Sequence, residues 1–191
     1  MKDFLLHTLL PPLDRVSRWL AVVAQVMIVV LIGVMFFEVV ARRIFNSPTI
    51  WSVDIVYMVN GTLFLMGASY TLLREKHVRI DFLSSRLPLR VQHLINAAFY
   101  SALLLPLLYL TTHSSVRKAW RAFERGTVEN MSTWEPLIWP FLAGIAIGLL
   151  GLALQVVLHL IRHLIGIFDP HAVPAPGQDV LERAQPARGT I

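Results

Sequence analysis

The sequence predicts an all-α polytopic membrane protein, a bundle of four transmembrane helices with an interfacial cytoplasmic segment between the second and third helices. Hydrophobic residues make up 55% of the 191 positions, and the mean hydropathy of +0.61 is far above that of an ordinary soluble domain. Four stretches reach the roughly 20 apolar residues that a helix needs to cross a bilayer. None shows the period-2 alternation of a membrane β-barrel, so all four are expected to be helical.

The first residues, 1–18, are predicted to be a retained interfacial segment at the cytoplasmic face and not a cleaved signal peptide. Their apolar run is short and closed by Pro11 and Pro12, and no small-residue cleavage site follows. A frayed tail is the alternative. Asp14 and Arg18 are expected to mark the water boundary before the first span.

The remaining boundaries follow from where charges interrupt the apolar stretches. The predicted spans are 19–41, 54–73, 91–116 and 136–162. Between them lie a periplasmic loop at 42–53, an amphipathic cytoplasmic loop at 74–90 and a second periplasmic loop at 117–135. The cytoplasmic tail at 163–191 has the composition of a disordered segment.

Positive charge predicts the orientation, because cytoplasmic flanks keep Lys and Arg. The N-terminal flank, the middle loop and the tail, with Arg162 at the start of the tail counted in, carry eleven of these residues, against six in the two other loops. Both termini are therefore placed in the cytoplasm. The net charge of +5 on so apolar a chain also fits contact with anionic lipid headgroups and not with nucleic acid.

Several residues within the spans predict close helix contacts. Gly144 and Gly148 form a GxxxG pair, which lets a neighbouring backbone approach closely. Asn60 belongs to a second span that is unusually polar without charge, so polar groups of this span are expected to face the bundle or a partner protein. Pro106 and Pro140 are expected to kink or cap the third and fourth helices.

Ionisable side chains are nearly absent from the middle of the spans, where they are the default functional candidates. Glu38 stands four residues before Arg42, and the two are expected to pair on one helix face; an inter-subunit contact or an ion pathway is the alternative. His93, His159 and His163 fall at the cytoplasmic ends of two spans, so a haem held by two imidazoles is conceivable. Their polar neighbours are instead typical of interfacial histidines.

No chemistry of an enzyme is expected. The sequence contains no phosphate-binding glycine loop, no metal-ligand spacing and no nucleophile–base pair. The absence of cysteine removes disulfides, thiolate zinc sites and iron–sulfur clusters. No cofactor is therefore predicted.

Three blocks of residues near the helix ends form a distinctive series. The first comprises Glu38, Arg42, Arg43, Trp51 and Asp54. The second comprises Gly67, Arg74, His77, Asp81 and Pro88. The third comprises Trp134, Pro136, Trp139 and Pro140, and leads into Gly144. In this order they resemble the small membrane subunit (DctQ-type) of tripartite ATP-independent periplasmic (TRAP) transporters, although that family often has glutamate at the place of Asp54.

The resemblance implies a secondary transporter of the bacterial inner membrane, in which a periplasmic binding protein delivers an organic anion to two membrane subunits. It implies that the large subunit holds the sodium and substrate sites and that the small subunit is a static scaffold. The three blocks and Gly148 are then candidates for contact with the large subunit or for a structural role. The candidates for docking the binding protein are Arg42, Arg43, Arg117, Lys118, Arg121 and Arg125. A solvated interfacial charge is the alternative for each.

Two other functions stay open at this point. The first is a stand-alone four-helix transporter or channel, and the second is the haem-binding electron-transfer bundle. Co-purification with a large polytopic partner separates the small-subunit interpretation from both.

Overall fold

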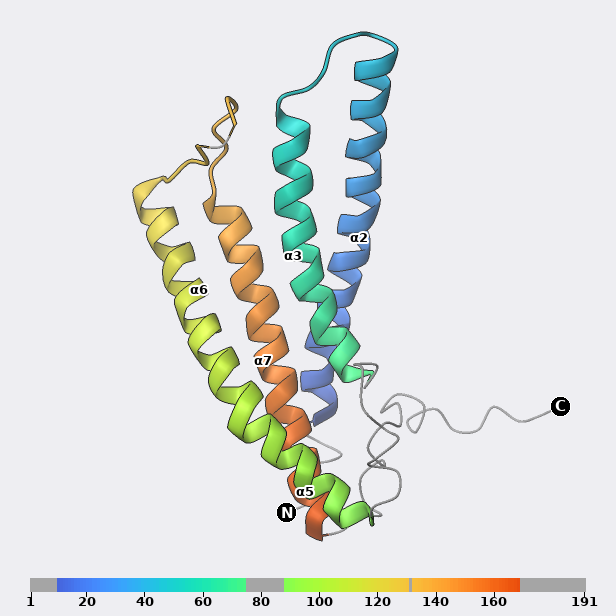
Figure 1. The fold of residues 1–191 in the computed structure, drawn as a ribbon, viewed down its shortest axis with the longest axis vertical. Coiled ribbons are helices and arrows are strands. Elements are labelled where there is room, and N and C mark those ends of the chain that lie inside the picture. Colours follow the sequence, from blue (N-terminus) through green and yellow to red (C-terminus); the bar gives the residue numbers. More distant parts are fainter. Residues whose placement is uncertain (1–9, 75–87, 131, 169–191) are drawn as a thin grey trace, which may run out of the picture.

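Four long helices dominate the computed structural model, which describes residues 10–74, 88–130 and 132–168 (Figure 1). The helices are α2 (Leu10–Arg43), α3 (Trp51–Leu73), α5 (Leu89–Phe99), the π-helical turn η2 (Tyr100–Leu104), α6 (Leu105–Arg125) and α7 (Trp139–Phe168). Since α5, η2 and α6 follow one another without a break, these elements give four helices long and apolar enough to cross a membrane. Within the described ranges no β-strand is present, and one isolated bridge joins Val128 to Leu137. The predicted fold class is confirmed.

Prolines lie where the helix geometry tolerates them. Pro88 precedes the first residue of α5, and Pro140 is the second residue of α7, where a missing N–H group loses no helical hydrogen bond. Pro106 is the second residue after the π-helical turn. A proline ring clashes with the carbonyl group four residues earlier in a regular α-helix, and the wider turn lies at that place.

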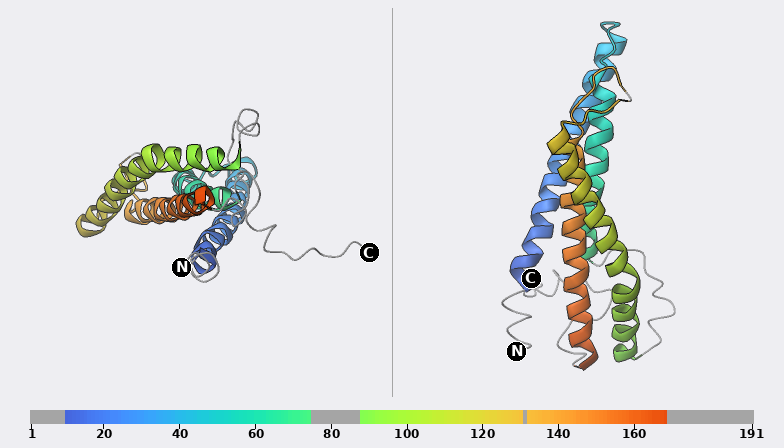
Figure 2. Two further views of the ribbon diagram at one scale, coloured as in Figure 1. Left: turned by 90° about the horizontal axis from the view of Figure 1, so that it is seen from below. Right: turned by 90° about the vertical axis from the view of Figure 1, so that its left-hand side faces the viewer.

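The helices alternate in direction, and α7 lies between α6 and the pair formed by α2 and α3 (Figure 2). The described residues of α2 begin, and those of α7 end, at the same end of the bundle (Figure 1). We call this the terminal end. The opposite end, where residues 44–50 and 126–138 connect the helices, is the loop end. At the terminal end α5 and α7 extend beyond α3, whereas α2 and α3 extend further at the loop end (Figure 1).

The helix boundaries differ from the expected spans at several places. The first helix begins at Leu10, within the segment expected to be interfacial, and the last continues to Phe168, into the expected tail. The third helix continues to Arg125, so residues 117–125, expected in a loop, are helical. It ends there because Gly126 adopts the left-handed conformation, with φ of 58°, that commonly terminates helices. The fourth helix begins at Trp139. The amphipathic segment predicted between the second and third spans falls mainly on residues 75–87, outside the described ranges.

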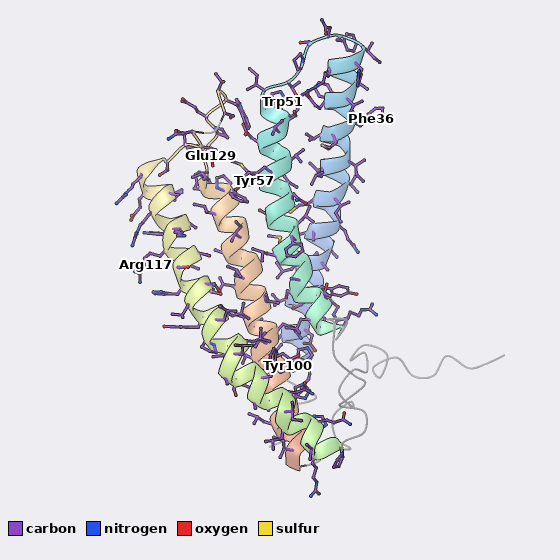
Figure 3. The ribbon with its side chains drawn as sticks, in the orientation of Figure 1. Phe36, Trp51, Tyr57, Tyr100, Arg117 and Glu129 are labelled. Carbon is purple, nitrogen blue, oxygen red and sulfur yellow. The ribbon has the colours of Figure 1, made fainter. Side chains whose placement is uncertain are left out.

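The buried core follows α7. Leu149 and Val156 of this helix pack with Leu72 of α3, Tyr100 of η2 and Leu108 of α6. The side of α2 that faces away from the bundle exposes large apolar side chains such as Phe36, which is 71% exposed (Figure 3). This distribution is that of a bundle whose outer surface contacts lipid.

Candidate functional site

A network of buried polar side chains joins α2, α3 and α7 near the terminal end. Arg162 donates a hydrogen bond to Asp14 at 2.5 Å, and their side chains are 6% and 7% exposed. Gln155 donates to the same carboxylate at 3.4 Å and accepts a hydrogen bond from the Ser17 hydroxyl at 3.0 Å. The Ser17 hydroxyl lies 2.8 Å from that of Ser69. Three helices distant in the sequence are therefore held at one level.

Two expectations change at this network. Asp14 is 5% exposed, so the interpretation that it marks the water boundary is wrong. Arg162, counted among the flanking charges, is buried against it. Taking both charges out of water is unfavourable, and the pair is tolerated because each charge neutralises the other and Gln155 adds a hydrogen bond.

The three histidines meet in a second buried cluster, whose α7 residues alternate with those of the network. His93 and His159 have no exposed surface and His163 is 2% exposed. The Nδ1 atoms of His93 and His163 are 3.0 Å apart, and the Tyr100 ring stacks on His163 with 5.5 Å between ring centroids. The expectation that these side chains are interfacial is wrong, because they pack within the contact between α5, η2 and α7. Tyr100 is labelled in Figure 3.

A haem does not fit this cluster. The rings of His93 and His163 touch directly, with centroids 5.3 Å apart, so the porphyrin plane has no space between them. In the part of the chain that the structure describes, no three His, Asp or Glu side chains are arranged to hold a metal ion. The fit of α5 on α7 at this cluster depends on Gly166, where a Cβ atom would lie 2.7 Å from the His93 ring.

The glycines of α7 contact α3. A Cβ atom at Gly144 would lie 2.5 Å from the Thr62 side chain, and one at Gly148 would lie 2.8 Å from the Leu65 Cβ atom and 3.0 Å from the Met66 backbone nitrogen. The prediction that these glycines serve close helix packing is confirmed. The idea that they suit docking to another protein is wrong, because α3 of the same chain occupies the space.

Glu38 organises the loop end. Its Oε1 atom accepts hydrogen bonds from Arg42 Nη2 at 2.6 Å and Nε at 3.0 Å, which is the ion pair expected from their spacing. Its Oε2 atom accepts from the Thr49 backbone N–H at 3.0 Å and from the Thr49 hydroxyl. The carboxylate therefore fastens the first loop to α2. Trp51, which begins α3, stacks on Phe37 with ring centroids 5.8 Å apart.

The second loop is fastened to α3 by Asp54, whose carboxylate accepts a hydrogen bond from the Ser132 hydroxyl. The loop closes on itself through the Ile138 N–H group, which donates to the Thr127 carbonyl at 3.1 Å. Glu135 adopts a left-handed conformation with φ of 47° at its turn. Polar contacts at this end thus fix the loop conformation.

The six basic residues proposed to dock a binding protein lie at or near the loop end. Arg42 is engaged by Glu38, and the other five are exposed. Arg117, Arg121 and Arg125 follow one another at four-residue intervals, which places them on one side of α6. Figure 3 shows Arg117 pointing away from the bundle. They form a row on a helix, not a cluster in a loop.

Comparison with known proteins decides the family. The family model for the DctQ component of tripartite ATP-independent periplasmic transporters matches residues 31–166, from the second half of α2 nearly to the end of α7. The chain belongs to this DctQ family. The DctQ family is one of transporter components and not of enzymes.

This DctQ chain is also similar to the sialic acid TRAP transporter permease protein SiaT of Haemophilus influenzae (strain 86-028NP). The two are 24% identical over 105 residues, which are 55% of this chain and 16% of SiaT. The DctQ chain therefore corresponds to a small part of that relative.

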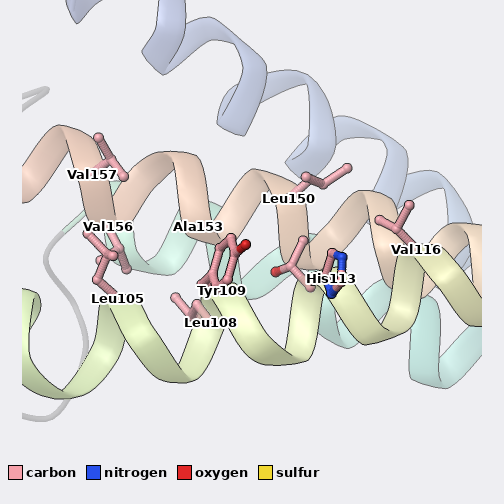
Figure 4. A pocket seen from close by; sticks show the side chains of 10 residues that line it. Leu105, Leu108, Tyr109, His113, Val116, Leu150, Ala153, Val156 and Val157 are labelled. Carbon is pink, nitrogen blue, oxygen red and sulfur yellow. The ribbon is translucent and has the colours of Figure 1, made fainter.

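Two apolar grooves lie on the surface of the DctQ bundle. The first, of about 380 Å³, runs between α6 and α7 and is lined by residues such as Leu108, Val156 and His113 (Figure 4). The second, of about 530 Å³, lies between α3, α7 and the second loop, and includes Met58 and Trp134. Such surfaces accept lipid chains or apolar helix faces. The linings of both grooves are largely apolar.

The other predicted residues, those of the motif blocks and Asn60 of the second span, have separate places. Arg74 donates from Nε to the Tyr70 hydroxyl at 2.9 Å and lies over that ring. Asn60 is exposed on α3, and a Cβ atom at Gly67 would meet no atom within 4 Å. Pro136 lines the second groove with Pro140. His77 and Asp81 lie outside the described residues.

The sequence interpretation missed the partners within the buried network. Gln155, His159 and Arg162 recur at intervals of four and three along α7, and Asp14 and Ser17 recur at three along α2. Such spacing places polar groups on one side of each helix. Two matching polar stripes at the same end of an apolar bundle are the signal that could have revealed their contact.

Proposed function

We propose that this DctQ subunit is the small permease subunit of a TRAP transporter, where it scaffolds the large membrane subunit and helps to dock the periplasmic binding protein during sodium-coupled uptake of an organic anion. The observation that carries the scaffold role is that the described buried polar groups form contacts within the chain. The buried ion pair and the loop carboxylates bind residues of the same chain at the two ends. Between these ends α3 and α7 pack through glycines and apolar side chains.

The matched relative supports a large membrane partner. SiaT is named a permease protein, and the stretch similar to this chain makes up only 16% of it. A protein that joins such a stretch to a much longer permease indicates that the two parts act together. In the present case the large part is expected to be a separate subunit.

Co-purification tests the scaffold role. The full chain, carrying an affinity tag, is extracted from its native membranes in a mild detergent, and a large polytopic subunit is expected to come with it at a fixed ratio. Reconstituted alone in vesicles, the chain is expected to give no sodium-dependent anion uptake. Isolation of the chain without such a partner, or uptake by the chain alone, would contradict the proposal and favour a stand-alone transporter.

The orientation belongs to the same proposal. Positive charges in the N-terminal flank, the middle loop and the tail support cytoplasmic termini, with the loop end in the periplasm. A reporter that is active only in the periplasm, fused after Ile191, is expected to stay inactive. An active reporter would reverse the topology.

Docking of the binding protein is assigned to the exposed basic residues of the loop end, since complementary charge speeds capture of a partner and orients it. Reversing the charge of Arg43, Arg117, Lys118, Arg121 and Arg125 to Glu is expected to slow capture of the loaded binding protein and to weaken its salt dependence. Unchanged capture and transport in this variant would remove the docking role and leave the scaffold role intact.

A further inference from the structure

The side of α3 that faces away from the bundle carries polar as well as apolar residues, which is unfavourable for a surface that contacts lipid. We call it the outer face of α3 and define it by Val53, Asn60, Phe64, Gly67 and Thr71, which recur at intervals of seven, four, three and four. Val53 and Phe64 are 64% and 72% exposed, and Asn60 is exposed as well. No described helix covers this face.

Asn60 is the decisive residue of the face. It is the tenth of the 23 residues of α3, which places it roughly 14 Å along the helix from its start, deep within the apolar stretch. Its side-chain amide has two donors and an acceptor, yet within the described ranges it makes no hydrogen bond. An amide left unpaired in hydrocarbon is unfavourable, so a partner with a polar group is expected opposite it.

A second exposed amide lies at the same level on the neighbouring helix. The contact between Ser17 and Ser69 sets the register of the antiparallel helices α2 and α3. Gln25 is eight residues after Ser17, and Asn60 is nine residues before Ser69, so the two amides are nearly level. Gln25 is exposed and also without a hydrogen bond among the described residues. Two such groups at one depth favour a covering protein over lipid.

The hydroxyl groups of two partly buried threonines, one of them on the outer face itself, need no partner from another protein. Thr71 donates to the Gly67 carbonyl at 3.1 Å, and Thr111 of α6 donates to the Leu107 carbonyl at 2.8 Å. Each hydroxyl is satisfied by its own helix and tolerates lipid. The apolar groove between α6 and α7 likewise fits acyl chains without a polar partner.

Gly67 adds space for a close approach. A Cβ atom there would meet nothing within 4 Å, in contrast with Gly148, whose space α3 fills. Phe64, one turn away, projects beside this opening. A facing helix can therefore bring its backbone near Gly67 and pack against the Phe64 ring.

We propose that a transmembrane helix of the large membrane subunit packs on the outer face of α3, with a polar side chain against Asn60 and its closest backbone approach at Gly67. The inference rests on the proposed function, because it names the surface through which the scaffold contact is made.

The first test uses two glycines as a matched pair. At Gly67 and at Gly33 an added Cβ atom would meet no atom within 4 Å, so Gly67→Leu and Gly33→Leu are both expected to fold. Gly67→Leu is expected to reduce co-purification of the large subunit by about tenfold or more, and Asn60→Leu by severalfold. Gly33→Leu is expected to leave it unchanged. Equal recovery with Gly67→Leu and the unaltered chain, or equal loss with both leucine variants, would overturn the proposal.

The second test uses photo-cross-linking from the position of Phe64. A benzoyl-phenylalanine at this position keeps an aromatic ring, and the same group in place of Leu110 on α6, which is 65% exposed, is the control. The expected product joins position 64 to the large subunit, with none from position 110. A product joining two copies of this chain, or only lipid adducts from position 64, would overturn the proposal. Failure of the unaltered chain to retain a large subunit would instead overturn the proposed function.

Discussion

The two ends of the bundle use polar side chains for different purposes. At the terminal end Asp14, Ser17, Gln155 and Arg162 bond across helices that are 138 or more residues apart in sequence. At the loop end Glu38 bonds to residues four and eleven positions away and fastens a loop to its own helix. The polar contacts at the terminal end therefore hold the helices to one another, whereas those at the loop end mainly hold a loop to one helix.

This difference matters for a scaffold subunit. Helices that are tied at one end hold their relative positions, so the outer face of α3 keeps a fixed shape. Loops that are each fastened to a single helix, as Thr49 is to Glu38 and Ser132 is to Asp54, can adapt to a partner without disturbing the bundle. We therefore expect substitutions at the terminal end to reduce the stability of the whole bundle and those at the loop end to change the loops alone.

Arg162→Leu is expected to give the largest effect. The substitution leaves the buried carboxylate of Asp14 without its cation and lowers the free energy of unfolding by about 3–5 kcal/mol. Reversible unfolding of the chain in mixed micelles, followed by circular dichroism, measures this change. A double variant that also carries Asp14→Asn removes the orphaned charge and keeps an acceptor for Gln155, so it is expected to recover most of the loss. A double variant as unstable as Arg162→Leu would contradict the explanation.

Gly166→Ala and Gly61→Ala compare the terminal end with the middle of the contact between α3 and α7, with one methyl group each. The new Cβ atom would lie 2.7 Å from the His93 ring or 2.9 Å from the Phe141 ring. His93 is fully buried and cannot move aside, whereas Phe141 is half-buried and can turn toward lipid. We expect Gly166→Ala to lower the free energy of unfolding by about 1–3 kcal/mol, and Gly61→Ala by clearly less. Thermal unfolding measures both, and the reverse order would show that the histidine cluster is loosely packed.

The difference between local contacts and contacts across helices also explains which features can be predicted from the sequence. Hydropathy identifies the four spans, and the pair between Glu38 and Arg42 follows from their four-residue spacing, because both depend on local sequence. The pair between Asp14 and Arg162 joins residues 148 positions apart, and its existence depends on the register between helices. A single sequence does not contain that register.

Two incorrect expectations have a common physical origin. Charges at 117–125 interrupt the apolar run and predict a loop, but charged residues are good helix formers and the helix simply continues to Arg125. Polar neighbours made His93 and His163 resemble interfacial residues, but adjacent residues on a helix point about 100° apart, so an exposed neighbour says little about burial. Arg162, one such neighbour, is itself buried.

Glu38→Ala is expected to act on the first loop with little effect on the bundle. It removes the hydrogen bonds to Arg42 and Thr49 that hold residues 44–50 against α2. Because Arg42 and Arg43 are trypsin sites at the end of that helix, cleavage there in vesicles with the loop end outward is expected to speed up severalfold. Glu38→Gln keeps an acceptor for Thr49 and is expected to be intermediate. Unchanged cleavage with a large loss of stability would contradict the local role.

Ser132→Ala is expected to give the smallest effect. It removes the hydroxyl that donates to Asp54 and so releases one tether between the second loop and α3, while the backbone bond between Ile138 and Thr127 remains. Amide hydrogen exchange within 127–138 is expected to quicken, with the free energy of unfolding changed by no more than about 0.5 kcal/mol. Ser132→Thr keeps the hydroxyl and is expected to exchange like the unaltered chain. If Ser132→Ala destabilised the bundle as much as Arg162→Leu, the loop end would have to share in the tertiary packing, and the distinction between the two ends would fail.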